Sequence, residues 1–201
     1  MGKIILIRHG ESEGNRIRHF TTSPNAPITD LGRRQALEAA LRIESLFKPS
    51  LVVASPYFRA RETARIIAEH LGLEIMIEHD FREQSLGAFA GKPYESVRED
   101  PEFRPDRPWE WRPPGGESQQ DVLLRTAPAL DRMARMHPDS ELVIVSHGGV
   151  MRAMWAYVTG RWEDAHVPPN CGIVVVEHDG SRYKEPRVVG PESARSHETG
   201  G

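Results

Sequence analysis

Three short runs of aliphatic residues are the clearest feature of the hydrophobic pattern. They cover residues 4–7, 51–54 and 142–145, and within each run the apolar positions are continuous. A strand of a parallel sheet has such a run when helices cover both faces of the sheet, because every side chain is then buried. The runs therefore predict three central strands.

Helical patterns separate these runs. After the second run, apolar side chains recur at the spacing of one helix face, at Ala60, Ala64, Ile67, Ala68 and Leu71. Gly72 follows as a stop signal for this helix. Thr29 or Asp30 can cap an earlier helix that runs to about Phe47.

The side chains on the inner face of that earlier helix are expected to be Leu37, Ala40 and Leu41. A further apolar helix covers residues 151–158 and is closed by Gly160. Residues 119–136 also have a helical pattern, but Pro128 falls inside it. Because proline removes a backbone hydrogen bond, we expect a kink or an interruption there.

Strands that alternate with helices predict a three-layer α/β/α fold with a mostly parallel sheet. A hairpin that turns at Asp179 and Gly180 would add an antiparallel strand at one edge. We expect residues 1–185 to form a single domain, in which 87–117 is an insertion or lid. Residues 186–201 are polar and are predicted to be a disordered tail.

The predicted insertion has an unusual composition. Residues 101–116 contain five prolines, two tryptophans and several arginines. Two interpretations of Phe103, Trp109 and Trp111 stay open: these side chains form an apolar wall over a bound substrate, or they anchor the insertion to the domain.

Composition narrows the classes of function. A net charge of −3 over 201 residues gives no basic excess for nucleic acid or an anionic membrane surface. No apolar run approaches the roughly 20 residues of a membrane span, and no cleavable signal segment is recognised. Cys171 is the single cysteine, which fits a reducing compartment. We therefore expect a cytoplasmic protein.

Polar groups follow the predicted strands at their carboxyl ends. Arg8 and His9 follow the first run, His147 follows the third, and Arg59 and Arg61 come about one turn after the second. In open α/β sheets these ends converge on the ligand-binding crevice. Two imidazoles and at least two guanidinium groups in one crevice predict a site for an anion.

Each of these residues also has a purely structural interpretation. A single histidine at a strand end is commonly structural, and one of Arg59 and Arg61 can simply be solvated. Glu83 can be a loop carboxylate paired with Arg82. Gly10, Gly148 and Gly149 can serve turn geometry alone. The conjunction of phosphate-binding residue types at three strand ends favours the functional interpretation.

A metal site is the alternative chemistry. His9, Glu83 and His147 have the residue types of a facial triad for Zn²⁺ or Fe²⁺. Arg8 places a cation beside such a metal, and no H-x-x-x-H, H-x-H or cysteine pair supports it. We therefore expect no metal ion and no cofactor.

Six segments between residues 3 and 177 contain most of these polar positions. They are L-I-R-H-G-E-S-E-G-N, A-P-I-T-D-L-G-R-R-Q-A, S-P-Y-F-R-A-R-E-T-A, F-R-E-Q-S-L-G, P-G-G-E-S and V-S-H-G-G-V-M-R-A. In this order they resemble the signature segments of the histidine phosphatase superfamily, also called the phosphoglycerate mutase-like family. The resemblance implies catalysis through a phosphohistidine.

The resemblance also implies roles for individual residues. His9 would attack phosphorus, while Arg8, Arg59 and His147 would bind the phosphoryl oxygens. Glu83 would give a proton to the leaving alcohol and later take one from water.

Further positions match the family as binding residues. Asn15 and Gly148 are implied to bind phosphate. Thr21 and Thr22 stand where mutases have a substrate-contacting Thr-Gly pair, and Leu86 is a further candidate substrate contact.

Physical chemistry supports this scheme. A neutral imidazole is nucleophilic near pH 7, and neighbouring arginines keep it neutral by raising the cost of its protonation. A protonated carboxylic acid would assist the leaving alcohol. The arginines oppose a raised pKa for Glu83 and a bound phosphate favours it, so the sequence leaves this balance open.

The sequence favours a phosphatase over a cofactor-dependent phosphoglycerate mutase. Mutases of the family have tyrosine where Leu86 stands and asparagine where Gly149 stands. The segment between Glu83 and Gly116 is also shorter than the mutase insertion. We therefore expect hydrolysis of a small phosphorylated metabolite.

A third alternative is a non-catalytic module that binds a phospho-ligand or a protein. The presence of His9, Glu83 and His147 argues against it. A homodimer would be possible through an exposed apolar edge at residues 172–176, unless that strand lies inside its own sheet.

Overall fold

The middle layer of the protein is a six-stranded sheet with the strand order β3-β2-β4-β1-β5-β6. The computed structural model describes residues 1–21 and 23–190. The strands are β1 (Gly2–Arg8), β2 (Pro49–Ala54), β3 (Ile75–Ile77), β4 (Glu141–Ser146), β5 (Ile173–His178) and β6 (Arg187–Val189). The first four pair in parallel, whereas β5 is antiparallel to both β1 and β6. The mostly parallel sheet with an antiparallel edge is thus confirmed.

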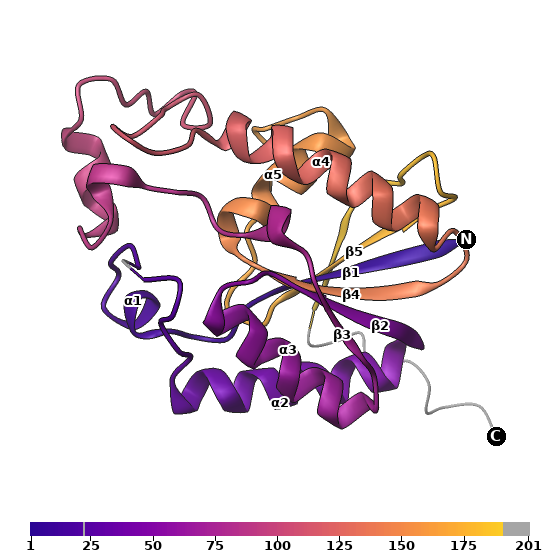
Figure 1. Ribbon diagram of the computed structural model, residues 1–201. Coiled ribbons are helices and arrows are strands. Elements are labelled where there is room, and N and C mark those ends of the chain that lie inside the picture. The colour runs from indigo at the N-terminus through magenta and orange to yellow at the C-terminus, as the bar shows by residue number, and fades with distance from the viewer. Residues whose placement is uncertain (22, 191–201) are drawn as a thin grey trace.

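Helices cover both faces of the sheet, as Figure 1 shows. The pair on one face is α2 (Asp30–Leu46) and α3 (Phe58–Leu71), and the pair on the other is α4 (Gln119–Met136) and α5 (Gly148–Thr159). A short helix, α1 (Glu13–Arg16), follows β1. The three-layer prediction is confirmed.

Alternate side chains of each central strand enter two separate cores. In β1, Ile4 and Leu6 pack with α4 and α5, and Ile5 and Ile7 pack with α2 and α3. All four side chains are at most 2% exposed. Burial on both faces is the physical reason why the strand is apolar at every position.

The prediction for the inner face of α2 is wrong at two positions. Leu37 and Leu41 are about half exposed, at 47% and 51%, whereas Ala36, Ala40 and Ile43 are fully buried. Thr29 does cap the helix, since its Oγ1 accepts a hydrogen bond from the Gly32 amide. The small alanines face inward because their size lets α2 approach its neighbours closely.

Helix α4 runs through Pro128 without interruption. Pro128 and Leu124, whose carbonyl loses its helical partner, both lie on the exposed side of the helix. Water can therefore hydrate this carbonyl, and the buried face of the helix is preserved. Gly72 and Gly160 end α3 and α5 in the left-handed conformation, as predicted.

The predicted tail boundary at residue 186 is wrong. Arg187–Val189 form β6, which pairs with β5. This strand was not predicted because it has only three residues, of which Val189 alone is buried. Residues 191–201 of the predicted tail lie outside the described residues. The segment 172–176 lies within the sheet, since β5 pairs with β1 on one side and with β6 on the other.

The segment between β3 and α4 projects beyond the sheet at the end where α1 lies (Figure 1). It contains the 3-10 helices η1 (His79–Phe81), η2 (Gly87–Phe89) and η3 (Tyr94–Glu99). Trp111 packs edge-on against Phe89 and Phe103, and Trp109 stacks on Trp162 of the main body. Trp109 thus anchors the segment to the domain, whereas Phe103 and Trp111 pack within the segment, and none of the three lines the pocket described below.

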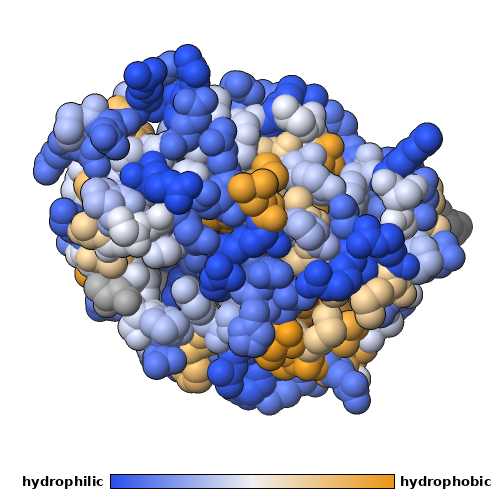
Figure 2. Space-filling view, turned by 45° about the horizontal axis from the view of Figure 1, so that its top comes forward, coloured by the Kyte–Doolittle hydropathy of each residue, from blue (hydrophilic) through white to orange (hydrophobic). Residues whose placement is uncertain are grey.

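The surface is mainly hydrophilic on the face drawn in Figure 2, where hydrophobic residues occur in small groups. Among the described residues, no helix has the length and apolar character that crossing a membrane requires.

The orientation of helix α2 can be tested with a pair of variants, one on its buried side and one on its exposed side. Ile43→Ala is expected to lower the free energy of unfolding by about 2–5 kcal/mol, because it leaves a cavity in the core. Leu41→Ala, two residues away on the exposed side, is expected to change it by less than about 0.5 kcal/mol. Urea denaturation of both variants measures the difference. Equal effects would contradict the orientation of this helix.

Candidate active site

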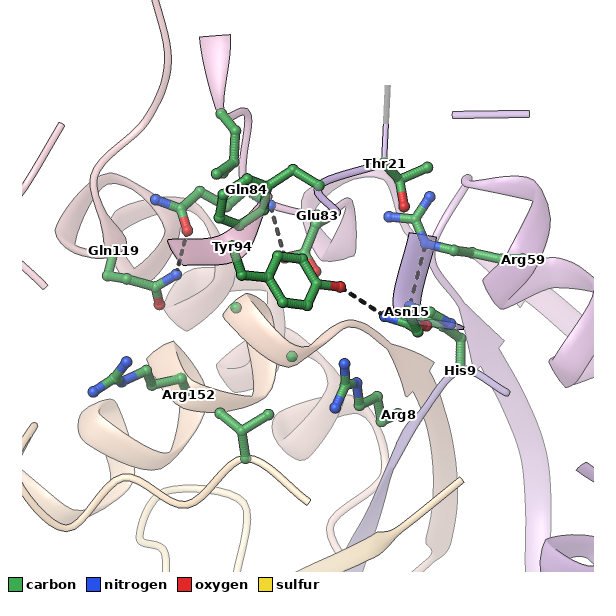
Figure 3. Close-up of a pocket in the computed structure, with 15 residues that line it drawn as sticks. Arg8, His9, Asn15, Thr21, Arg59, Glu83, Gln84, Tyr94, Gln119 and Arg152 are labelled. Atoms are coloured by element: carbon green, nitrogen blue, oxygen red, sulfur yellow. Dashed lines mark hydrogen bonds between the residues drawn. The ribbon is translucent and has the colours of Figure 1, made fainter. Parts of the chain in front are cut away.

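The carboxyl ends of two adjacent strands and the start of α3 meet at one pocket, shown in Figure 3. Arg8 ends β1, His9 follows it, and Arg59 lies in the first turn of α3. Ser146, at the end of β4, pairs with Arg8 across the sheet and brings His147 to the same place. The pocket has a volume of about 450 Å³, within the usual range for small-molecule sites.

His9 is a neutral imidazole in which one ring nitrogen carries no proton. Its Nδ1 lies 2.7 Å from the carbonyl of Gly10, which can only accept, so Nδ1 carries the proton. Nε2 then has a lone pair, toward which Arg59 Nε donates at 3.2 Å. Burial, and then the charge of Arg59, hold the pKa of His9 well below its ordinary value.

His147 has the opposite tautomer. Its Nε2 lies 2.7 Å from Ser55 Oγ, and this hydroxyl already accepts a hydrogen bond from the Tyr57 amide. The Ser55 hydroxyl has no other acceptor among the described residues, so we assign its proton to the bond with Nε2, which leaves Nδ1 as the protonated nitrogen. Burial and the charge of Arg59 hold the pKa of His147 well below its ordinary value. The His9 and His147 rings are 5.2 Å apart between centroids.

At the end of the pocket where His9 lies, three buried donors have no hydrogen-bond partner among the described residues. They are Arg8 Nε, Arg59 Nη1 and His147 Nδ1. A buried donor without an acceptor is costly, and three from separate elements are rare unless a ligand supplies the acceptors. Two of them are cationic, so a ligand with anionic oxygens fits the set.

Arg8 is fixed by the loop that precedes β5. Its Nη1 donates to the carbonyl of Pro168 at 3.1 Å, and its own carbonyl accepts from the Cys171 amide at 3.0 Å. Cys171 has a positive φ of 55°, an uncommon conformation for a residue other than glycine. The strained turn therefore helps to orient a guanidinium of the site.

Glu83 lies in the same pocket with its carboxyl group buried. Burial raises the pKa of Glu83, although the charge of Arg59 and the hydrogen bond from the Gln84 amide oppose it. In the balance that the sequence left open, burial is thus the larger influence, and the pKa of Glu83 is raised from its ordinary value. The alternative pairing with Arg82 is not formed, since Arg82 contacts Asp80 and Glu117 instead.

Arg125 of α4 fixes the backbone that carries Glu83. Its guanidinium donates to the carbonyls of Asp80, Arg82 and Glu83 at 2.6–3.2 Å, and it forms an ion pair with Glu117. One helix residue thus holds an otherwise irregular segment in a single conformation.

Asn15 connects the loop that follows β1 to the inserted segment. Its Oδ1 accepts from the Ser12 amide and from Asn170, and its Nδ2 donates to the hydroxyl of Tyr94 at 3.1 Å (Figure 3). The same Asn170 side chain donates to the carbonyl of His9 at 2.8 Å. Asn15 and Tyr94 both line the pocket.

The remaining predicted site residues are placed as follows. Thr21, Leu86 and Gly148 line the pocket, and Thr22 lies outside the described residues. Arg61, one residue beyond Ala60 in α3, is exposed. Within residues 1–21 and 23–190, no group of three or more His, Cys, Asp or Glu side chains could hold a metal ion.

The family model of the histidine phosphatase superfamily (branch 1) matches residues 4–189. The chain belongs to this superfamily. Phosphoglycerate mutase-like protein 4 of Arabidopsis thaliana is 36% identical over 76% of this chain and 69% of its own length. The metal-independent phosphoserine phosphatase of the same plant is 30% identical over 78% of this chain and 68% of its own length.

A solved structure of this superfamily has the same fold. The mycobacterial glucosyl-3-phosphoglycerate phosphatase in complex with VO3 superimposes with a TM-score of 0.80 at 25% identity, over 94% of this chain and 97% of that one.

Several residues in or next to the pocket of this histidine phosphatase were not predicted from the sequence. Ser55, Gln84 and Arg152 stand in the quoted segments S-P-Y-F-R-A-R-E-T-A, F-R-E-Q-S-L-G and V-S-H-G-G-V-M-R-A, so their positions next to predicted site residues could have identified them. Tyr94, Gln119 and Asn170 lie outside the quoted segments, and tertiary packing brings them to the site.

The tautomers of His9 and His147 can be tested directly. Because the pKa of both residues is lowered, their ring ¹⁵N signals are expected to keep the neutral pattern as the pH falls through about 6.5, the ordinary histidine value. NMR of ¹⁵N-histidine-labelled protein measures this, and His9→Gln and His147→Gln assign the signals. Titration of either ring near 6.5 would contradict the description of the site.

Proposed function

We propose that this chain is a metal-independent phosphomonoester hydrolase that acts through a phosphohistidine on His9. The observation that carries this proposal is the unprotonated Nε2 of a buried, neutral His9, which accepts only from Arg59, beside three donors that lack acceptors. A phosphoryl group supplies acceptors for these donors and an electrophile for that nitrogen.

In the first proposed step, His9 Nε2 attacks phosphorus, so that an N–P bond forms as the P–O bond to the alcohol breaks. Arg8, Arg59 and His147 Nδ1 stabilise the charge on the transferring phosphoryl oxygens. The departing alcohol oxygen takes its proton from Glu83, whose raised pKa suits a general acid.

In the second proposed step, water attacks the phosphohistidine. Glu83, now a carboxylate, accepts one proton from this water as the N–P bond breaks. Inorganic phosphate leaves, and His9 is again a neutral imidazole. Atoms and charge balance without a metal ion or a cofactor.

The packing around Gly149 supports hydrolysis over the mutase alternative. A Cβ atom at this position would lie 2.6 Å from Glu83 Oε1 and 2.9 Å from Gln119 Nε2. The asparagine that the mutases carry here would therefore require the ends of the Glu83 and Gln119 side chains to shift from their present positions. Leu86, in the place of a mutase tyrosine, lines the pocket without a polar group.

The names of similar proteins support hydrolysis in part. One is named a metal-independent phosphoserine phosphatase and another a glucosyl-3-phosphoglycerate phosphatase, whereas GpmB of Salmonella choleraesuis, 28% identical over 91% of this chain, is named a probable phosphoglycerate mutase. Names of both kinds occur, so the contacts of Gly149 are the stronger support.

Hydrolysis of p-nitrophenyl phosphate tests the proposed nucleophile. The wild type is expected to be active in the presence of EDTA, and His9→Ala is expected to lose at least about 10³-fold in rate, because no other group can carry the phosphoryl intermediate. His70→Ala, at the far end of α3, is the matched control and should keep full activity. Loss of activity with EDTA, or an active His9→Ala variant, would refute the mechanism.

A second assay separates hydrolysis from transfer. With 3-phosphoglycerate and a catalytic amount of 2,3-bisphosphoglycerate, we expect release of inorganic phosphate and little 2-phosphoglycerate. The reason is that the pocket lacks the two polar side chains that distinguish the mutases. Rapid formation of 2-phosphoglycerate would establish the mutase instead.

A further inference from the structure

The pocket has a second positively charged end that the proposed chemistry does not use. Figure 3 shows Arg152 on the opposite side of the pocket from His9 and Arg59. Arg152 belongs to α5, one turn beyond the glycines that follow His147. It is thus carried by the same helix that begins at the phosphate-binding end.

Arg152 has no carboxylate partner. No hydrogen bond or ion pair joins its side chain to another described residue, and its Nε is buried without an acceptor. Burial also lowers the pKa of Arg152, with no nearby acid to oppose this. A half-buried guanidinium without a counterion is costly, because its donors are removed from water and not paired.

A hydrogen-bond chain next to Arg152 leaves an acceptor free as well. Gln84 Nε2 donates to the carbonyl of Glu117, so Gln84 Oε1 is the atom that accepts from Gln119 Nε2, at 2.6 Å. This orientation leaves Gln119 Oε1, which is buried and has no partner among the described residues. Gln119 lies on the same side of the pocket as Arg152 (Figure 3).

The charges of the two ends differ. Arg8 and Arg59 with the imidazole donor of His147 match the two negative charges of a phosphoryl group. The single Arg152 matches one negative charge, and the edge of a guanidinium that includes Nε pairs side-on with the two oxygens of a carboxylate. The pocket volume of about 450 Å³ limits the molecule that joins the two groups to a small one.

We infer that the substrate is a small phosphomonoester whose alcohol part carries a carboxylate, and that Arg152 binds this carboxylate. A hydroxyl or ammonium group next to the carboxylate donates to Gln119 Oε1. This inference rests on the proposed function, since it assigns the leaving-group end of the same pocket. Arg152 is a specificity residue and takes no part in the transfer of the phosphoryl group.

Two esters that differ only at the inferred contact provide the test. In 3-phosphoglycerate a carboxylate stands where glycerol 3-phosphate has a hydroxymethyl group, and both esters keep the neighbouring hydroxyl. The wild type is expected to hydrolyse 3-phosphoglycerate with a kcat/KM at least about tenfold higher, since a charge-assisted pair is gained. A wild type without this preference overturns the inference, whatever the variants do.

Variants then assign the preference to its residue. Arg152→Gln is expected to remove the preference and to leave glycerol 3-phosphate and p-nitrophenyl phosphate within about threefold of the wild type. Arg34→Gln, on the exposed side of α2, is the matched control and should keep the preference. If Arg152→Gln keeps it, the inference is wrong.

The outcomes separate the two proposals. Hydrolysis of all three esters without a preference refutes the role of Arg152 and leaves the phosphatase intact. A wild type that hydrolyses none of them refutes the phosphatase, and the inference falls with it.

Discussion

The burial of cationic and titratable groups without a counterion is the constraint on which this molecule depends. His9 and His147 are buried next to Arg59, and each would lose its function if it bound a second proton. Burial in a low-dielectric environment penalises the charged form of both rings, and the guanidinium adds to that penalty. The two imidazoles therefore stay neutral, as the proposed roles of His9 as nucleophile and His147 as hydrogen-bond donor require.

This arrangement requires a rigid support. The charged groups stand on β1, on α3 and at the start of α5, which pack through two continuous apolar cores. Hydrogen bonds to neighbouring residues also orient these groups: Ser55 contacts the imidazole of His147, and the carbonyl of Pro168 accepts from the guanidinium of Arg8. The donors thus keep their positions when no acceptor is bound, which is the preorganisation that phosphoryl transfer needs.

The parts of the fold that follow local rules were predictable from the sequence. Fully buried strands, a threonine cap and glycine stops depend on nearby residues, and so does the delivery of Arg8, His9 and His147 to one edge of the sheet. The inner face of α2 was not, because leucine spacing indicates hydrophobicity, whereas the helix packs through its alanines. Strand β6 was not predicted because it has three residues and only Val189 is buried. Residues such as Tyr94 and Asn170 reach the site only through tertiary packing.

The pocket has two walls that come from different parts of the chain, and Arg125 fixes one of them. One wall of the pocket belongs to the sheet, and the other belongs to the irregular segment that Arg125 ties to α4 through three carbonyl groups. Changes farther along that segment can reshape the entrance without moving the carboxyl group that Arg125 holds in place. The fold can therefore acquire new substrates by altering one wall while its reaction chemistry stays constant.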